Sequence, residues 1–170
     1  MELLKVVNLP ADESGTRPCS AEIEPIIAQL QQPIETFFQR YPTRRSAVMP
    51  ALYLAQSEYG YLSPDVMEAV ATILQVSPVQ VYEIATFYEM FHTEPIGRYH
   101  LQLCTNISCM LLGAERLLAH IEQTLNIKSG ESTADGLFTL SCVECLGSCN
   151  TAPVMQINNE PYCENLSEQR

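Results

Sequence analysis

The 170-residue chain contains no tryptophan and few basic residues, with nine Lys and Arg against 20 Asp and Glu. The resulting formal net charge of −11 argues against a nucleic-acid-binding protein or a ligand of anionic membrane surfaces. No stretch offers the roughly 18 uninterrupted apolar residues of a membrane span. Residues 1–10 lack the apolar core of a secretory signal. Apolar residues still make up 46% of the chain, which is enough to bury a core.

Two kinds of catalytic motif are also missing. The sequence has no Gly-rich nucleotide-binding loop of its own. No Ser–His–Asp order or paired carboxylates stand out, so hydrolase chemistry has no support.

Cysteine is scarce in the first hundred residues, where Cys19 stands alone. The other six fall within 60 residues: Cys104, Cys109, Cys142, Cys145, Cys149 and Cys163. In a chain without a secretory signal, such clustering favours metal or redox chemistry over a disulfide framework. We expect Cys19 and Cys163 to be ordinary buried or half-buried thiols.

The sequence divides into three parts. Residues 1–20 show no periodicity and predict a flexible arm, and residues 21–96 predict a helical bundle. Residues 97–170 return to alternating apolar positions and predict a mixed α/β domain. The segment 94–97, with Pro95 and Gly97, is typical of a hinge between the last two parts.

Helix starts in the predicted bundle are marked by local signals. Ser63-Pro64 and Ser77-Pro78 each place an N-cap residue before a proline at the first helical position. Pro33 should break or kink the first helix, 21–32, before residues 34–41. A second helix is expected over residues 46–59, with Pro50 in its first turn, where proline is tolerated, if Ser46 caps it. The aromatic residues of the last helix are expected in the bundle core: Phe87, Tyr88 and Phe91.

Beyond residue 97 the expected order is strand, helix, strand and then a hairpin. The strands cover residues 99–104 and 138–142, and the helix between them covers 114–125. A crossover of this length can join two parallel strands. The hairpin is expected over residues 153–157 and 162–166.

The cysteine spacings are the most informative motif. Four residues separate Cys104 from Cys109, and the second group, expected to follow a strand, reads Cys142-x2-Cys145-x3-Cys149. Since the carboxyl ends of parallel strands lie at one edge of a sheet, the two groups should converge. Four thiolates on such loops suit a 2Fe–2S cluster or a zinc ion. Cys142-x2-Cys145 alone also matches a dithiol redox pair.

Several stretches together resemble one known family, the thioredoxin-like 2Fe–2S subunits of NADH-quinone oxidoreductase, respiratory complex I. The second cysteine group continues as Val143-Glu-Cys-Leu-Gly-Ser-Cys149 and then Ala152-Pro153, with Cys104-x4-Cys109 upstream. The other matching stretches are Arg44-Arg45-Ser46-Ala47, Glu58-Tyr59-Gly60-Tyr61, Ala85-Thr86-Phe87-Tyr88, Pro95-Ile96-Gly97 and Asp135-Gly136-Leu137-Phe138-Thr139. The resemblance covers roughly residues 34–166.

The resemblance implies an α+β fold, with an N-terminal helical bundle followed by a thioredoxin-like 2Fe–2S ferredoxin domain. It implies one 2Fe–2S cluster held by Cys104, Cys109, Cys145 and Cys149. It also implies electron transfer, one electron at a time, with a partner flavoprotein subunit that holds FMN and the NADH site. The chain would then act only as a subunit of an oxidoreductase, together with further complex I subunits. It would lie in the cytoplasm, peripheral to the inner membrane.

Three alternatives accompany this interpretation. Cys142 is a fifth cysteine beside the site, so a set of Cys104, Cys109, Cys142 and Cys145 competes with the family pattern. The chain could instead be the equivalent diaphorase subunit of an NAD-linked hydrogenase or formate dehydrogenase. In a different class of protein, the cysteines would hold a zinc ion in an interaction domain without a redox role.

Other polar candidates are interpreted as structural. His92, His100 and His120 are scattered and are expected at the surface or in the core, with His100 a candidate donor near the cysteines. The one basic patch consists of Arg40, Arg44 and Arg45. It is interpreted as a solvated helix start, or as a contact for an acidic partner surface.

Overall fold

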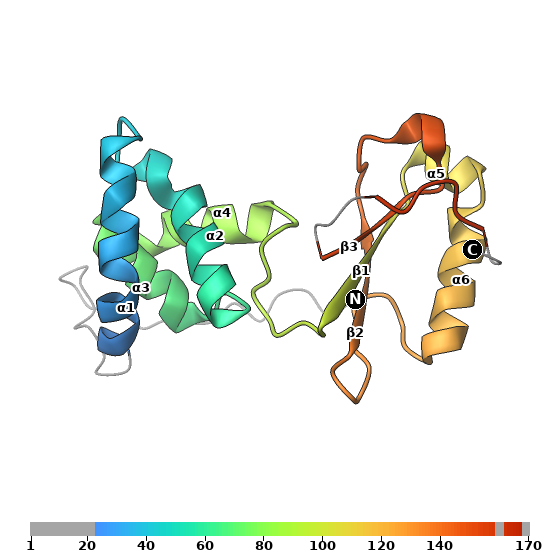
Figure 1. Cartoon of the computed structure of the whole chain (residues 1–170), viewed down its shortest axis with the longest axis horizontal. Helices are drawn as coiled ribbons and strands as arrows, with labels where there is room; N and C mark the ends of the chain where they lie inside the picture. Colours follow the sequence, from blue (N-terminus) through green and yellow to red (C-terminus); the bar gives the residue numbers. More distant parts are fainter. Residues whose placement is uncertain (1–22, 159–161, 168–170) are drawn as a thin grey trace.

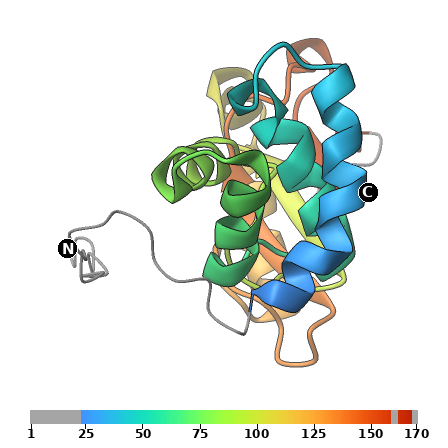
Figure 2. The ribbon, with the colours of Figure 1, turned by 90° about the vertical axis from the view of Figure 1, so that its left-hand side faces the viewer.

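A computed structural model describes residues 23–158 and 162–167 of the chain. The predicted arm, residues 1–20, and Cys19 lie outside the described residues. Figure 1 shows a group of helices beside a small sheet, and Figure 2 places that group in front of the sheet. Among the described helices, none is both long and apolar enough to cross a bilayer.

Four α-helices and two short 3-10 turns form the helical group. They are α1 (Glu24–Glu35), η1 (Thr36–Gln39), η2 (Arg45–Ala47), α2 (Val48–Tyr59), α3 (Pro64–Leu74) and α4 (Pro78–Phe87). The predicted caps of α3 and α4 are confirmed. The Ser63 hydroxyl accepts a hydrogen bond from the Val66 amide at 3.3 Å, and Ser77 forms a capping box with Gln80. These caps satisfy amides that no helical carbonyl can reach.

Two of the predicted helix boundaries are wrong. Pro33 does not break α1 but lies inside its last turn. It is exposed, as is Gln29, so water can satisfy the Gln29 carbonyl that the missing amide leaves free. Ser46 does not cap α2, because it lies within η2. Its amide instead donates to the Thr43 hydroxyl at 3.1 Å.

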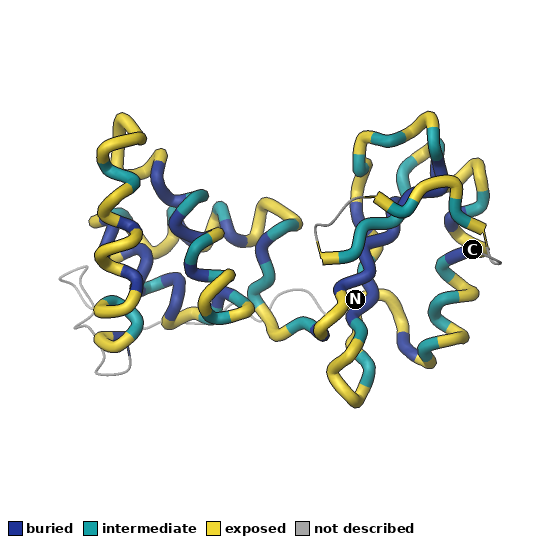
Figure 3. The backbone as a smooth tube through the Cα atoms, in the orientation of Figure 1, coloured by how far each residue is buried: buried dark blue, intermediate teal, exposed yellow. Residues whose placement is uncertain are grey.

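The bundle has one continuous apolar core. Leu30 and Ile34 of α1, Leu52 of α2, Leu74 of α3 and Val81 of α4 are all fully buried in it. Figure 3 shows buried positions gathered between the helices and along the strands.

The prediction for the aromatic residues of α4 is only partly correct. Phe91 is buried in the core, but Phe87 is 76% exposed and Tyr88 is 37% exposed. Helix α4 ends at Phe87, and Tyr88 has extended backbone. Because the helix ends before Phe91, Phe87 and Tyr88 do not share a buried helical face with it.

A three-stranded sheet forms the second half, in the order β2-β1-β3. Strand β1 (Tyr99–Cys104) pairs in parallel with β2 (Phe138–Val143) and antiparallel with β3 (Met155–Ile157). Between β1 and β2 lie α5 (Ile107–Leu111) and α6 (Ala114–Leu125). The short 3-10 turn η3 (Cys149–Thr151) precedes β3. The predicted parallel pair and its crossover helix are confirmed.

The predicted hairpin forms only in part. Met155 and Cys163 make an isolated antiparallel bridge, with amide-to-carbonyl distances of 3.0 and 2.8 Å. Residues 159–161, between its arms, lie outside the described residues.

One glutamine of α2 ties the segment between the two halves to the bundle. The Gln56 side chain donates to the Met90 carbonyl at 2.9 Å and accepts from the His92 amide at 2.7 Å. The Leu62 amide also donates to the His92 carbonyl at 2.7 Å. These bonds fix the course of the chain as it leaves α4 for β1.

Candidate functional site

The first cysteine pair lies where β1 ends. Cys104 is the last residue of β1, and its amide donates to the Val154 carbonyl at 3.1 Å. Asn106 then caps α5, with its side-chain oxygen accepting from the Ile107 amide at 2.9 Å. This cap starts a helical turn that carries Cys109, so Cys109 lies within a short helix. Both cysteines are buried, at 2% and 3% exposure.

The second pair lies on the loop after β2. Cys145 and Cys149 are exposed, and their Sγ atoms are 3.5 Å apart. Gly147 has a φ of +83°, a value that side chains rarely adopt. Its amide donates to Cys145 Sγ at 3.4 Å. The loop is thus folded back so that both sulfur atoms meet.

Contacts between the two loops bring these pairs together. The Thr105 amide donates to the Val143 carbonyl at 3.2 Å, which extends the parallel pairing past the end of β1. The Asn106 amide group donates to the Glu144 carboxylate at 3.1 Å. As predicted from the parallel strands, the two loops meet at one edge of the sheet.

The thiols perturb one another's ionisation. Burial, a hydrogen bond with Cys104 and the charges of Cys104 and Cys149 raise the pKa of Cys109 to about 11, against an opposing hydrogen bond from the Val154 backbone. A hydrogen bond and the charge of Cys145 raise the pKa of Cys149, while a hydrogen bond from Ser108 opposes the shift. Burial and hydrogen bonds between thiols thus favour the protonated forms of Cys109 and Cys149, and a bound cation would favour their thiolates.

Cys142 and Cys163 are placed differently. Cys142 lies within β2, opposite Leu103 of β1, as the predicted strand over residues 138–142 implies, and not on the loop that carries Cys145 and Cys149. Cys142 is exposed, and it is not among the groups that shift the pKa of Cys109 or Cys149. Cys163 is half-buried, in its bridge to Met155.

The histidines do not gather with the cysteines. His100 is 5% exposed on β1, and its Nε2 atom bonds the Ser141 hydroxyl at 2.8 Å. Its ring meets the His92 ring edge-on, with centroids 4.9 Å apart. Burial, with a smaller contribution from His92, lowers the pKa of His100 to about 4. The hydrogen-bond partner of His100 is therefore a serine, not a cysteine.

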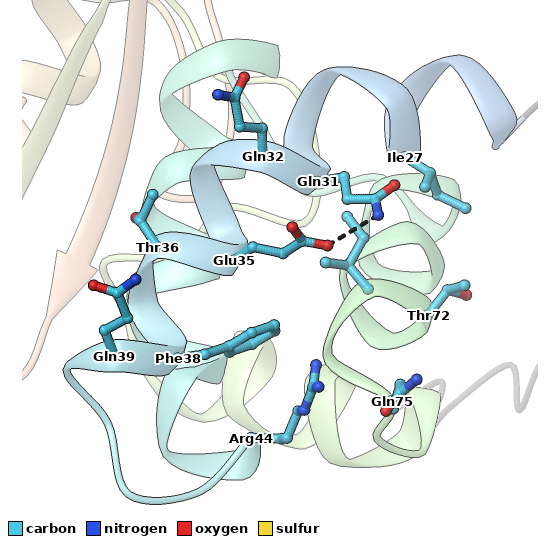
Figure 4. A pocket seen from close by; sticks show the side chains of 11 residues that line it. Ile27, Gln31, Gln32, Glu35, Thr36, Phe38, Gln39, Arg44, Thr72 and Gln75 are labelled. Carbon is cyan, nitrogen blue, oxygen red and sulfur yellow. Dashed lines mark hydrogen bonds between the residues drawn. The ribbon is translucent and has the colours of Figure 1, made fainter.

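A cleft of about 700 Å³ on the helical bundle offers no comparable chemistry. Figure 4 shows Glu35 in this cleft, accepting a hydrogen bond from Gln31 at 2.9 Å. Arg44, from the basic patch, lies over the Phe38 ring at 3.9 Å. Arg45 pairs with Glu83 at 3.9 Å, so two of the three basic residues make contacts inside the bundle. With a single carboxylate, the cleft lacks the paired groups of acid–base catalysis.

Sequence reasoning missed the apolar surface that surrounds Cys109. Four large apolar side chains are exposed on and beside α5: Ile107 at 67%, Met110 at 45%, Leu111 at 76% and Leu112 at 58%. No Asp, Glu, Lys or Arg occurs from Tyr99 to Ala114. The run Met110-Leu111-Leu112 after Cys109 could have indicated this surface. The same run would also be expected of residues buried in the domain core.

The family of the chain follows from comparison with known proteins. The model of the thioredoxin-like [2Fe-2S] ferredoxin family matches residues 34–170. The chain belongs to this family, which confirms the predicted family resemblance and the α+β fold class.

Two relatives with high sequence identity are subunits of NADH-quinone oxidoreductase. Over 141 residues the chain is 60% identical to the E 2 subunit of NADH-quinone oxidoreductase from Rhizobium meliloti, a match that covers 83% of each chain. It is 45% identical over 139 residues to NADH-quinone oxidoreductase subunit 2 of Thermus thermophilus, which covers 81% of this chain and 77% of the relative. Both relatives are subunits of an oxidoreductase.

Solved structures share the fold at lower identity. A crystal structure of the NAD+-reducing [NiFe]-hydrogenase in the H2-reduced state matches with a TM-score of 0.61 and 24% identity, covering 70% of this chain. The air-oxidized state matches with a TM-score of 0.59, 23% identity and 68% coverage. The matched region spans 20% of the hydrogenase chain in each case.

Proposed function

We propose that this chain is the iron–sulfur electron-transfer subunit of an NADH dehydrogenase module. The observation that carries the proposal is the meeting of two cysteine pairs at one edge of the sheet, where neighbouring cysteines raise the pKa of Cys109 and of Cys149. Cys104 and Cys109 from the β1–α5 loop, with Cys145 and Cys149 from the β2–η3 loop, are the proposed ligands of one 2Fe–2S cluster. When bound, such a cluster accepts and releases single electrons.

The four cysteines form two close pairs. Cys145 and Cys149 have their Sγ atoms 3.5 Å apart, and Cys109 is hydrogen-bonded with Cys104. Two such pairs match a cluster with four cysteine ligands.

The surrounding residues shape the site. Gly147 and Ser108 donate hydrogen bonds to Cys145 and Cys149, and such bonds stabilise the thiolate form and tune a reduction potential. The link from Asn106 to Glu144 keeps the two loops at a fixed separation. One cysteine pair is buried and the other exposed, so the site is shielded on one side and open on the other.

The proposed partner is a flavoprotein subunit that holds FMN and the NADH site. Its docking face on this chain is the apolar, uncharged surface of Ile107, Met110, Leu111 and Leu112. Patches of this kind mark protein interfaces, and this one adjoins Cys109. With further subunits of complex I, the chain would lie in the cytoplasm, peripheral to the inner membrane. We propose residues 21–96 and 97–170 as its two domains.

The test is chemical analysis of the full chain purified without oxygen, with EPR of the dithionite-reduced protein. We expect iron and acid-labile sulfide in equal amounts and a rhombic 2Fe–2S signal. One zinc per chain and no such signal would contradict the proposal and identify a zinc-stabilised interaction domain. The copurifying large subunit decides between complex I and a diaphorase of a hydrogenase or formate dehydrogenase.

A further inference from the structure

A cleft of about 530 Å³ lies between the end of α4 and the part of the sheet that carries Gln102. Figure 1 shows α4 directed toward the sheet at this point. Aromatic residues of the bundle line one side, and Gln102 of β1 lies on the other. Leu146, from the loop between Cys145 and Cys149, completes the rim nearest the cysteines.

Three aromatic rings in this cleft are uncovered. Phe87 is 76% exposed, Tyr53 is 45% exposed and Tyr88 is 37% exposed. The rings of Phe87 and Tyr88 meet edge-on with centroids 5.0 Å apart, so their outer faces are free to receive another group. Ring faces carry negative charge density and attract planar cations.

Two acceptor groups reach the same cleft. Gln102 is only 4% exposed, and its Oε1 atom is the one buried side-chain nitrogen or oxygen in the described part of the chain that has no hydrogen-bond partner. Gln56, the matching glutamine at the junction, has partners at both ends. Glu89 adds a carboxylate, whose Oε1 accepts only a long bond of 3.4 Å from the Glu144 amide. It takes part in neither ion pair of the described residues.

From this arrangement we propose that the cleft binds an arginine side chain of a partner protein. A guanidinium group is planar, carries five donors and has no acceptor, so it can stack on the rings and serve both acceptors together. The charge also fits, because Glu89 is the one charged residue among those that line the cleft. The Gln102 amide reaches the incoming donor by turning about its terminal side-chain bond, which has broad rotational freedom. A partner held here would lie beside the Cys145–Cys149 loop.

Ligand-observed saturation-transfer NMR on the full chain tests the proposal directly. The probes are N-acetyl-argininamide and its neutral isostere N-acetyl-citrullinamide. We expect the arginine probe to bind about tenfold more tightly, as charge-assisted hydrogen bonds imply. Glu89→Gln should abolish most of that preference, Gln102→Leu should reduce it, and Phe87→Ser should weaken both probes.

The control is Tyr82→Ser, which removes an aromatic side chain of the same helix that is 56% exposed and does not line the cleft. It should leave both affinities unchanged. Equal binding of the two probes, binding of neither, or a preference that survives Glu89→Gln and Gln102→Leu would overturn the proposal. The EPR signal of each variant is recorded in parallel. A normal signal with no arginine preference rejects the cleft and leaves the proposed function standing.

Discussion

The two halves of the chain bury their apolar residues on different scales. In the helical half, seventeen buried residues form one continuous cluster. In the cysteine half, the described residues form two separate clusters of five and three buried residues, and the larger one includes Cys104 and Cys109 themselves. The bundle can be held by side-chain burial alone. In the cysteine half, part of the small core therefore lies at the proposed metal site.

The two halves also differ in which apolar side chains they expose. The second half exposes a run of apolar residues around Cys109, whereas three exposed aromatic residues of the first half, Tyr53, Phe87 and Tyr88, line the cleft near the sheet. We therefore expect the helical half to hold its fold by burial, and the cysteine half to gain stability from the proposed cluster and partner.

Removal of the metal group with a chelator should separate the two halves most clearly. We expect the cysteine half to lose about 4 kcal/mol of stability, the linkage free energy of a ligand present at a thousandfold excess over its dissociation constant. Hydrogen exchange would show this as lost protection in β1 and α6, with α2 and α3 retaining theirs. Equal loss in both halves would contradict the contrast.

Leu52→Ala in α2 should destabilise the helical half and spare the cysteine half. Leu52 is fully buried in the bundle core, so its truncation should lower the free energy of unfolding by about 3–4 kcal/mol. The EPR signal of the cysteine site should persist at low temperature. Leu111→Ala, which truncates a leucine that is 76% exposed in α5, is the matched control and should cost no more than about 0.5 kcal/mol. Chemical denaturation monitored by far-UV circular dichroism measures both.

Acid should destabilise the junction through His100. Its pKa is about 4 in the folded chain, against an ordinary value of 6.5, so the unfolded chain binds the proton more readily. The stability is therefore complete above pH 6.5 and is lost as the pH falls toward 4, by up to about 3 kcal/mol. His100→Gln should flatten this part of the pH profile. His120→Gln, at an exposed position, should leave the fall intact.

The smallest effect is expected at the cap of α3. Ser63→Ala removes the acceptor for the Val66 amide and should cost about 1 kcal/mol. Ser57→Ala, in the exposed last turn of α2, removes a hydroxyl that caps no amide and should be close to neutral. A similar loss in both variants would show that capping does not fix this helix start.

Local signals predicted those parts of the fold that depend on a few neighbouring residues. The starts of α3 and α4 follow from Ser-Pro pairs, and the parallel pairing of β1 with β2 follows from two alternating segments joined by a long crossover. The prediction failed at Pro33, where exposure of the helix lets water replace a lost hydrogen bond. It failed again at Phe87 and Tyr88, because helical spacing does not reveal where a helix ends.

The sequence predicted which cysteine loops meet at the candidate site, but not the contacts around them. The spacing of the cysteines and the parallel strands led to the meeting of the two loops. The link between Asn106 and Glu144 and the partnerless Gln102 oxygen both depend on segments distant in the sequence. The ligand set Cys104, Cys109, Cys145 and Cys149 stays a prediction, as does the role of Cys142.

If Cys104, Cys109, Cys145 and Cys149 hold one 2Fe–2S cluster, EPR of the reduced single Cys→Ser variants should separate these ligands from the other cysteines. We expect Cys145→Ser and Cys149→Ser to lose or grossly alter the rhombic signal of the native chain. Cys142→Ser and Cys163→Ser should retain it, together with the native iron content. Loss of the signal in Cys142→Ser with its survival in Cys149→Ser would contradict the assignment and place Cys142 among the ligands.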